Sequence, residues 1–252
     1  MCNLYQMTPK TDLDVFVRRH VADLFLPEYD DSKPVGPFGT GLFLGAHGDA
    51  GLRGQLGQWG MIRPGQPGRI DYIHPKPVPG RKPTAPRPRS TNNARIEGIE
   101  TKPTFGPAWK AARRCLVPAS WYAEPNWETG KCIWWHLQRA DGAPWFLAGL
   151  WSEWTDPETG EVVPNFTVIT RNCTGHPFLG RLHKPELDPK TRKPIQPERE
   201  DKRSLVHVDP ADWSRWLRGS ETDARDLLKL QPMSVFDRTD AMQTDNALRA
   251  LF

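Results

Sequence analysis

Residues 144–151 read P-W-F-L-A-G-L-W and residues 165–170 read N-F-T-V-I-T, two short apolar runs. Three further runs have the same character: G-L-F-L-G-A at 41–46, Q-L-G-Q-W-G-M-I at 55–62 and C-I-W-W-H-L-Q at 132–138. Runs of this length, apolar or alternating and bounded by Gly and Pro, are typical of strands. Regular helical segments do not separate them, which favours an antiparallel or mixed sheet over a doubly wound parallel one. The sequence therefore predicts an α+β protein with a curled, barrel-like sheet flanked by helices.

Helices are expected near both ends of the chain. Thr11 is suited to cap a helix in which Asp14 follows three residues later, and apolar residues then recur at helical spacing as far as Leu24. We expect further helices at 174–182, 212–217 and 221–230.

The length and composition indicate a globular protein. Of the 252 residues, 37% are hydrophobic, which is enough to bury a substantial core. Because β-rich domains often reach this size undivided, we predict one domain spanning residues 1–252. The formal net charge of +4 is compatible with an anionic partner but does not select one. The chain opens without a signal-peptide pattern and has no apolar run long enough to span a bilayer, so we expect a cytoplasmic protein with no membrane partner.

Four cysteines are scattered along the chain, at Cys2, Cys115, Cys132 and Cys173. They form no C-x-x-C pair and no Cys/His cluster with metal-ligand spacing, which argues against structural zinc and against a disulfide framework. We therefore expect no metal and no other cofactor.

Two polar segments interrupt the predicted strands. The segment 75–90 is rich in Pro and carries Lys76, Arg81, Lys82 and Arg87, and the segment 184–203 alternates charged residues with Pro. Both compositions are typical of surface loops. Each segment is either an edge that faces nucleic acid or a solvated insertion, and the sequence leaves both readings open.

The second residue brings two nucleophiles together. An initiator Met that precedes a small residue such as Cys2 is normally removed, which leaves a free α-amine beside the thiol. These groups titrate at about 8 and about 8.5, so we expect a usable nucleophilic fraction of each at neutral pH. The amine can form a Schiff base with an aldehyde, and the thiolate can then close a thiazolidine ring. The same two groups can also hydrolyse an amide. The N-terminus alone therefore does not distinguish aldehyde capture, amide hydrolysis and a structural cysteine.

Three further segments occur in order after the initial M-C. They are T-N-N-A-R-I-E at 91–97, R-C-L-V-P-A-S-W-Y-A-E-P at 114–125 and G-R-L-H-K-P at 180–185. Together they closely resemble the SRAP family, the SOS response-associated peptidases that are also called abasic site processing proteins. The resemblance extends from Met1 to about Val208. Several motifs in the same order make it specific, whereas each motif alone is weak.

The resemblance implies roles for individual residues. Asn93 corresponds to a family residue that holds the N-terminal amine, Glu124 to an acid that transfers protons during imine formation, and His183 to a histidine that assists opening of the sugar. Arg95 corresponds to a phosphate-contacting residue. Trp59 corresponds to a position near the DNA groove, and we expect its exposed ring to stack on a base.

The reaction of an amine with an abasic site requires these residue types independently of the resemblance. An abasic deoxyribose is mostly a closed hemiacetal, so a group that exchanges protons near neutral pH is needed to open it. Loss of water from a carbinolamine then needs an acid, which a partly buried carboxyl group can supply. A single strand is the expected substrate because a nucleotide inside a duplex would have to be extruded first.

We therefore expect a monomeric sensor that crosslinks covalently through Cys2 to abasic sites in single-stranded DNA and associates with the nucleoid when it does so. Weak strand-cleaving lyase activity and removal of its own Met1 are activities that the same groups allow. Two alternatives stay open: a thiol peptidase that acts on itself or other proteins, and a module that binds single strands without covalent chemistry.

Overall fold

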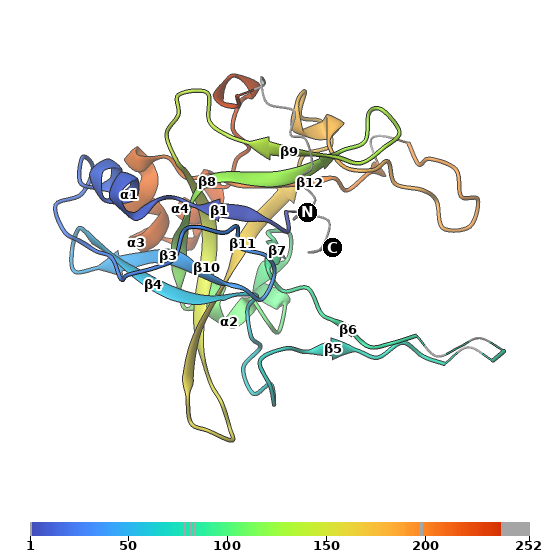
Figure 1. Ribbon diagram of the computed structural model, residues 1–252, viewed down its shortest axis with the longest axis horizontal. Coiled ribbons are helices and arrows are strands. Elements are labelled where there is room, and N and C mark those ends of the chain that lie inside the picture. The colour runs from blue at the N-terminus through green and yellow to red at the C-terminus, as the bar shows by residue number, and fades with distance from the viewer. Residues whose placement is uncertain (1, 78, 81, 83, 197–198, 238–252) are drawn as a thin grey trace.

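The computed structural model describes residues 2–77, 79–80, 82, 84–196 and 199–237 (Figure 1). The strands are β1 Tyr5–Met7, β2 Leu24–Phe25, β3 Thr40–His47, β4 Gly51–Trp59, β5 Tyr72–Ile73, β6 Arg87–Pro88, β7 Asn93–Arg95, β8 Arg114–Asn126, β9 Ile133–Leu137, β10 Trp145–Thr155, β11 Val162–Asn172 and β12 Arg203–Leu205. The α-helices are α1 Lys10–Val17, α2 Gly106–Lys110, α3 Trp213–Arg218 and α4 Glu221–Leu227. Short 3-10 helices are η1 Ile99–Thr101, η2 Leu179–Arg181, η4 Pro210–Asp212 and η5 Met233–Val235.

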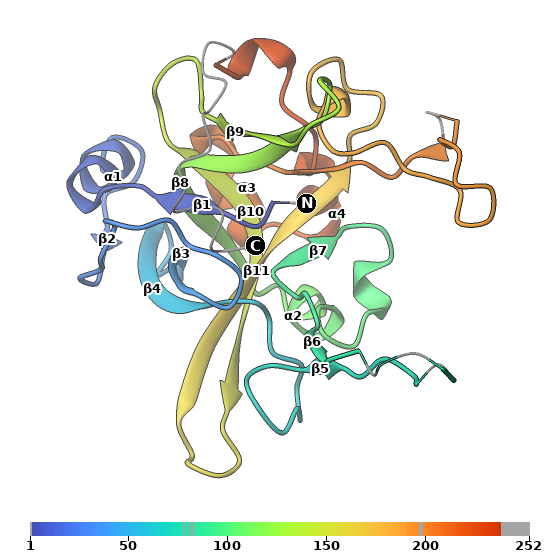
Figure 2. The same ribbon diagram turned by 45° about the vertical axis from the view of Figure 1, so that its right-hand side comes forward.

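Five of the strands close into a barrel. The order β11–β10–β8–β3–β4 is antiparallel throughout, and β4 then pairs in parallel with β11 through Gln58 and Trp59. Closure depends on Gly57, because a Cβ atom there would lie 2.7 Å from the carbonyl oxygen of Pro164 on β11. The predicted α+β architecture with a curled, mixed, barrel-like sheet is therefore confirmed (Figure 2).

The barrel strands are apolar because both of their faces are covered. Residues 115–119 of β8 and 145–150 of β10 are buried without interruption, as expected for strands that lie between a core and a covering layer. On the outside, the indole of Trp216 in α3 donates to the carbonyl oxygen of Cys115 at 2.9 Å. Inside, the rings of Phe43 and Phe166 pack with centroids 5.5 Å apart.

Two of the predicted helices differ from the structure. The first begins at Lys10, after Pro9, and ends at Val17, so the predicted cap at Thr11 and the extension to Leu24 are wrong. Leu24 instead pairs with β4, which satisfies its backbone through a sheet contact rather than a helix. The predicted helix over 174–182 is reduced to η2, because Nδ1 of His176 accepts the backbone N–H groups of the next turn at 3.0 and 3.2 Å. Helices α3 and α4 confirm the remaining two predictions, with every end within three residues of the predicted one.

Two segments project from the same side of the barrel in both views (Figures 1 and 2). One is the β5–β6 hairpin, and the other follows η2 and precedes β12. The second segment closes on itself, because Leu187 bridges Pro194 and the backbone N–H of Asp188 donates to Lys193 at 2.8 Å. Among the residues that the structure describes, no helix is long and apolar enough to cross a membrane.

Candidate active site

Strand pairing brings the N-terminus to Glu124. Tyr5 of β1 lies opposite Tyr122 of β8, and the carbonyl oxygen of Leu4 accepts the backbone N–H of Ala123 at 2.8 Å. Continuing this antiparallel register places Cys2 beside the end of β8 that carries Glu124. The side chains of Cys2 and Glu124 are both fully buried.

Two adjacent asparagines hold the main chain of Cys2. Strand β7 runs parallel to β11, with Asn93 opposite Val168. The side-chain amide of Asn93 donates to the carbonyl oxygen of Cys2 at 2.6 Å, and that of Asn92 donates to the same oxygen at 3.3 Å. Sequence reasoning missed Asn92, although it stands beside Asn93 in the T-N-N-A-R motif. Oδ1 of Asn93 is buried and has no hydrogen-bond partner among the described residues, so it can accept a further donor.

Trp59 is a structural residue. Its side chain is 0% exposed and packs edge-on against Tyr5, with ring centroids 5.0 Å apart. Its indole N–H donates to the carbonyl oxygen of Asn92 at 2.9 Å. The prediction that Trp59 offers an exposed ring to a DNA base is wrong, because β4 closes the barrel against β11 and the indole is enclosed there. Trp59 instead holds the backbone of Asn92, whose side chain donates to the carbonyl oxygen of Cys2.

His183 lies just after η2 and places its ring beside Glu124. Its backbone adopts a left-handed conformation with φ of 66°, and its N–H donates to the carbonyl oxygen of Pro125 at 2.7 Å. In the ring, Nε2 lies 2.7 Å from the carbonyl oxygen of Arg203 and 3.4 Å from Oε2 of Glu124. Because a carbonyl oxygen only accepts, Nε2 carries the proton, and Nδ1 of the neutral ring keeps its lone pair.

The surroundings of Cys2 and His183 favour the uncharged forms of both side chains. Burial raises the pKa of the Cys2 thiol well above its ordinary value, and the charge of Glu124 adds to this effect. The thiol donates to the carbonyl oxygen of Leu4 at 3.2 Å, which requires its proton. The expected thiolate fraction at neutral pH is therefore wrong for this buried group. Burial also lowers the pKa of His183, against the opposite effect of Glu124.

Two buried residues that sequence reasoning did not select also face Glu124. Burial and the charge of Glu124 raise the pKa of the Tyr122 phenol, and the same two causes, in the same order, raise that of the Cys173 thiol to about 12. Tyr122 stands two residues before Glu124 on β8, so both side chains point to one face of the strand. That spacing was visible in the sequence; the position of Cys173 was not.

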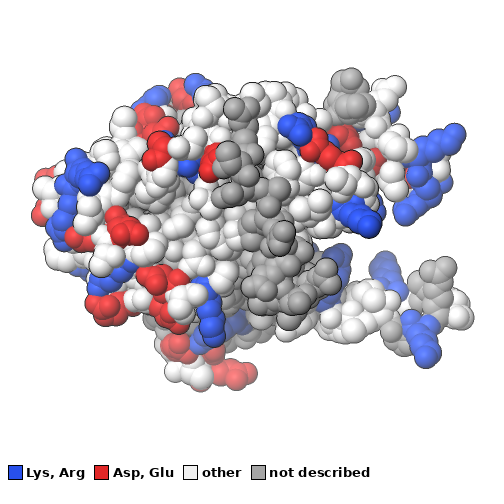
Figure 3. Space-filling view, turned by 45° about the horizontal axis from the view of Figure 1, so that its top comes forward, with Lys and Arg blue, Asp and Glu red and all other residues white. Residues whose placement is uncertain are grey.

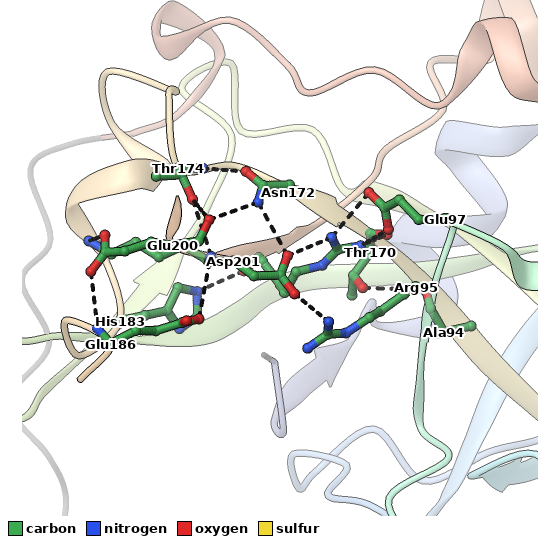
Figure 4. A network of polar contacts seen from close by, with 12 residues as sticks. Ala94, Arg95, Glu97, Thr170, Asn172, Thr174, His183, Glu186, Glu200 and Asp201 are labelled. Atoms are coloured by element: carbon green, nitrogen blue, oxygen red, sulfur yellow. Dashed lines mark hydrogen bonds and ion pairs between the residues drawn. The ribbon is translucent and has the colours of Figure 1, made fainter. Parts of the chain in front are cut away.

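Arg95 is placed differently from the buried group. It ends β7, its side chain is 55% exposed, and it forms an ion pair with Asp201 at the base of the second projecting segment (Figure 4). The structure thus brings Cys2, Asn93, Glu124 and His183 together and leaves Arg95 at the rim. In the described part of the chain, His, Cys, Asp and Glu side chains form no group of three that could hold a metal ion.

Residues 5–247 match the sequence profile of the family described as SOS response associated peptidase (SRAP). The chain belongs to the SRAP family. This family assignment covers nearly the whole chain and agrees with the family that the sequence motifs predict. Among curated proteins, none matches this SRAP chain.

Solved structures share the SRAP fold of this chain. A protein from Bordetella bronchiseptica is 26% identical, with a TM-score of 0.70 over 94% of this chain and 97% of that one. A protein from Bacteroides thetaiotaomicron is 19% identical, with a TM-score of 0.63 over 94% of this chain and 90% of that one. A phage-related protein from Bordetella bronchiseptica is 16% identical, with a TM-score of 0.55 over 94% and 92%. The last two similarities concern the fold alone.

Proposed function

We propose that this SRAP protein captures abasic sites in single-stranded DNA covalently, through the α-amine and thiol of Cys2 after Met1 has been removed. The observation that carries the proposal is the convergence of Asn93, Glu124 and His183 on Cys2 from three separate parts of the chain. An aldehyde trap needs such a set: a fixed amine, an acid and a base.

The first step opens the sugar. Nδ1 of His183 takes the proton of the C1′ hydroxyl, the bond from C1′ to the ring oxygen breaks, and that oxygen takes up a proton, which leaves an aldehyde at C1′. A neutral imidazole is required for this step, and the lowered pKa of His183 keeps it neutral at pH 7.

The next steps form the crosslink. The amine of Cys2 adds to C1′, and a proton moves to the oxygen to give a carbinolamine. The C–O bond then breaks as Glu124 in its acid form donates a proton to the departing hydroxyl, and the carboxylate takes back the proton that the nitrogen loses, so that water leaves and an imine remains. The sulfur adds to the imine carbon, and the thiol proton ends on the nitrogen. Aldehyde and aminothiol thus become thiazolidine and water.

The protonated thiol supports this order of events. A thiol that acts second, on an imine, delivers the proton that the ring nitrogen needs. Amide hydrolysis by a peptidase instead needs a thiolate as first nucleophile. Burial and the charge of Glu124 both favour the protonated form of Cys2, so aldehyde capture accords with the site better than a general thiol peptidase does.

A single strand suits the position of the nucleophile. Because Cys2 is enclosed by its neighbours, the damaged sugar has to leave the stacked strand to reach it, which a strand without pairing partners allows at low energetic cost.

The test is crosslinking to an abasic single-stranded oligonucleotide, followed on a denaturing gel. We expect a heat-stable band of protein plus DNA for the native protein and for Cys132→Ala, which removes a half-buried thiol elsewhere. Cys2→Ala retains an amine but no thiol, so its imine should hydrolyse and the band should be lost. A Cys2→Ala protein that forms the stable band as well as the native one would refute the proposal.

Cys2→Ser separates the two nucleophiles further. This variant can form the imine but not the thiazolidine, so borohydride should trap it on the DNA. Because a persistent Schiff base allows β-elimination, we expect more strand cleavage per crosslink from Cys2→Ser than from the native protein. A native-like stable crosslink from Cys2→Ser would show that the thiol takes no part.

A further inference from the structure

The carboxylate of Asp201 forms an ion pair with the guanidinium of Arg95 (Figure 4). The two residues are 106 positions apart in the sequence, and the segment 184–203 carries Asp201 back to the end of β7. At the end of β7, two residues after Asn93, Arg95 therefore presents an ion pair rather than a free cation.

Other contacts hold the Asp201 carboxylate in position. Its Oδ1 accepts from Nη1 of Arg203 at 3.0 Å and from the side-chain amide of Asn172 at 3.2 Å. Its backbone N–H donates to Oε1 of Glu186 at 3.1 Å. An exposed ion pair ordinarily contributes little because two long side chains must be ordered. Here Arg203 and Asn172 already order the carboxylate and Glu186 holds its backbone, so only the Arg95 side chain has to be fixed.

The surroundings of Arg95 carry a slight excess of acids rather than a positive field. The cations Arg95, Lys202 and Arg203 stand beside four acids, which are Glu97, Glu186, Glu200 and Asp201. In Figure 3, Lys and Arg side chains gather toward the outer ends of the two projections, and acidic side chains lie near the base of the upper one. A phosphate that approaches Arg95 thus meets a carboxylate already in the place of an anion.

We propose that Asp201 competes with a DNA phosphate for Arg95 and thereby limits the reversible, non-covalent binding of strands to the protein. The inference rests on the proposed function, in which DNA passes Arg95 on its way to Cys2. Competition weakens reversible binding of every strand by the same factor. A strand with an abasic site is then retained by its covalent bond, whereas an undamaged strand is released.

The test measures reversible binding of an unmodified single-stranded oligonucleotide of thymidines, which has no aldehyde, by fluorescence anisotropy at fixed salt. Asp201→Asn keeps the shape of the side chain and removes its charge. Asp188→Asn is the matched control, because it makes the same change of net charge in the same segment, where the Asp188 carboxylate accepts from the backbone N–H groups of Lys190 and Thr191. We expect Asp201→Asn to bind about threefold to tenfold more tightly than Asp188→Asn.

A double-mutant cycle with Arg95→Ala assigns the effect to the pair. In the Arg95→Ala background, Asp201→Asn should gain no more affinity than Asp188→Asn. The proposal is wrong if Asp201→Asn binds no tighter than the control, or if its gain persists without Arg95. Weaker binding would show that Asp201 orients Arg95 for phosphate. Asp201→Ser serves as a second variant, and crosslinking of abasic DNA by the native protein tests the proposed function separately.

Discussion

Nε2 of His183 lies 3.4 Å from Oε2 of Glu124, on a carboxyl group that is fully buried. His183 lies just after η2 and Glu124 lies on β8, and the backbone hydrogen bond from His183 to Pro125 joins the two segments. Burial lowers the pKa of the imidazole while Glu124 raises it, and burial has the larger effect. The pair therefore holds a neutral base next to a carboxyl group, and its two members can be changed separately.

Replacing Glu124 with Gln keeps the shape of the side chain and removes the proton donor. We expect the rate constant for crosslinking to fall about 100-fold, since general acid catalysis commonly contributes at least that much. Glu128→Gln is the control, because Glu128 lies just beyond β8 in an exposed ion pair with Arg181. Equal rates for Glu124→Gln and Glu128→Gln would show that Glu124 takes no part in the reaction.

His183→Asn tests the base and tolerates the left-handed backbone at this position. The ratio of native to variant crosslinking rates cancels the titration of the Cys2 amine. Because the pKa of His183 is lowered, the ring gains its proton at a lower pH than an ordinary histidine does, and the ratio should keep most of its value at neutral pH. It should decline only at lower pH, as the imidazole gains a proton. A decline that is already complete at pH 7 would contradict the lowered pKa.

Trp59→Phe distinguishes a structural tryptophan from a DNA-stacking one. Loss of the indole N–H removes one of two hydrogen bonds to the buried carbonyl of Asn92, which still accepts from the backbone N–H of Val168 at 3.0 Å, so the free energy of unfolding should fall by about 1 kcal/mol. Trp154→Phe loses a comparable bond, to Gln66 at 2.9 Å, away from Cys2. Both variants should bind undamaged single strands as the native protein does, and only Trp59→Phe should slow crosslinking. Weaker strand binding by Trp59→Phe but not by Trp154→Phe would instead indicate that Trp59 stacks on a DNA base.

His207 should make the protein sensitive to acid. It is buried against Trp145, with ring centroids 4.0 Å apart, and burial lowers its pKa to about 3. Between pH 6.5 and about 3 the unfolded chain binds a proton at this residue and the folded chain does not, so stability is lost as the pH falls. At pH 5 this loss amounts to about 2 kcal/mol relative to pH 8.

His207→Phe fills the same space without a titrating group. Denaturant unfolding at pH 8 and pH 5 should show a smaller loss of stability for this variant than for the native protein. An unchanged difference between the two pH values would mean that the acid sensitivity arises elsewhere, for example at His136, whose pKa burial lowers to about 4.

Much of the fold was readable from local patterns. The apolar runs at 144–151 and 165–170 are strands β10 and β11, because side-chain type and flanking Pro or Gly act over a few residues. Helix ends were predicted less well. Leu24 fits the helical spacing that starts at Leu13, yet it pairs with β4, because a sheet contact with a distant strand replaces the local preference.

The sequence by itself determined the chemical types at the site: an aminothiol at Cys2 and, through ordered motifs, Asn93, Glu124 and His183. Only the tertiary structure decided their surroundings. It enclosed Trp59, kept the proton on the Cys2 thiol and set Asp201 against Arg95. Burial and ion pairing depend on residues that lie far apart along the chain and meet only when the barrel closes, so no local pattern can report them.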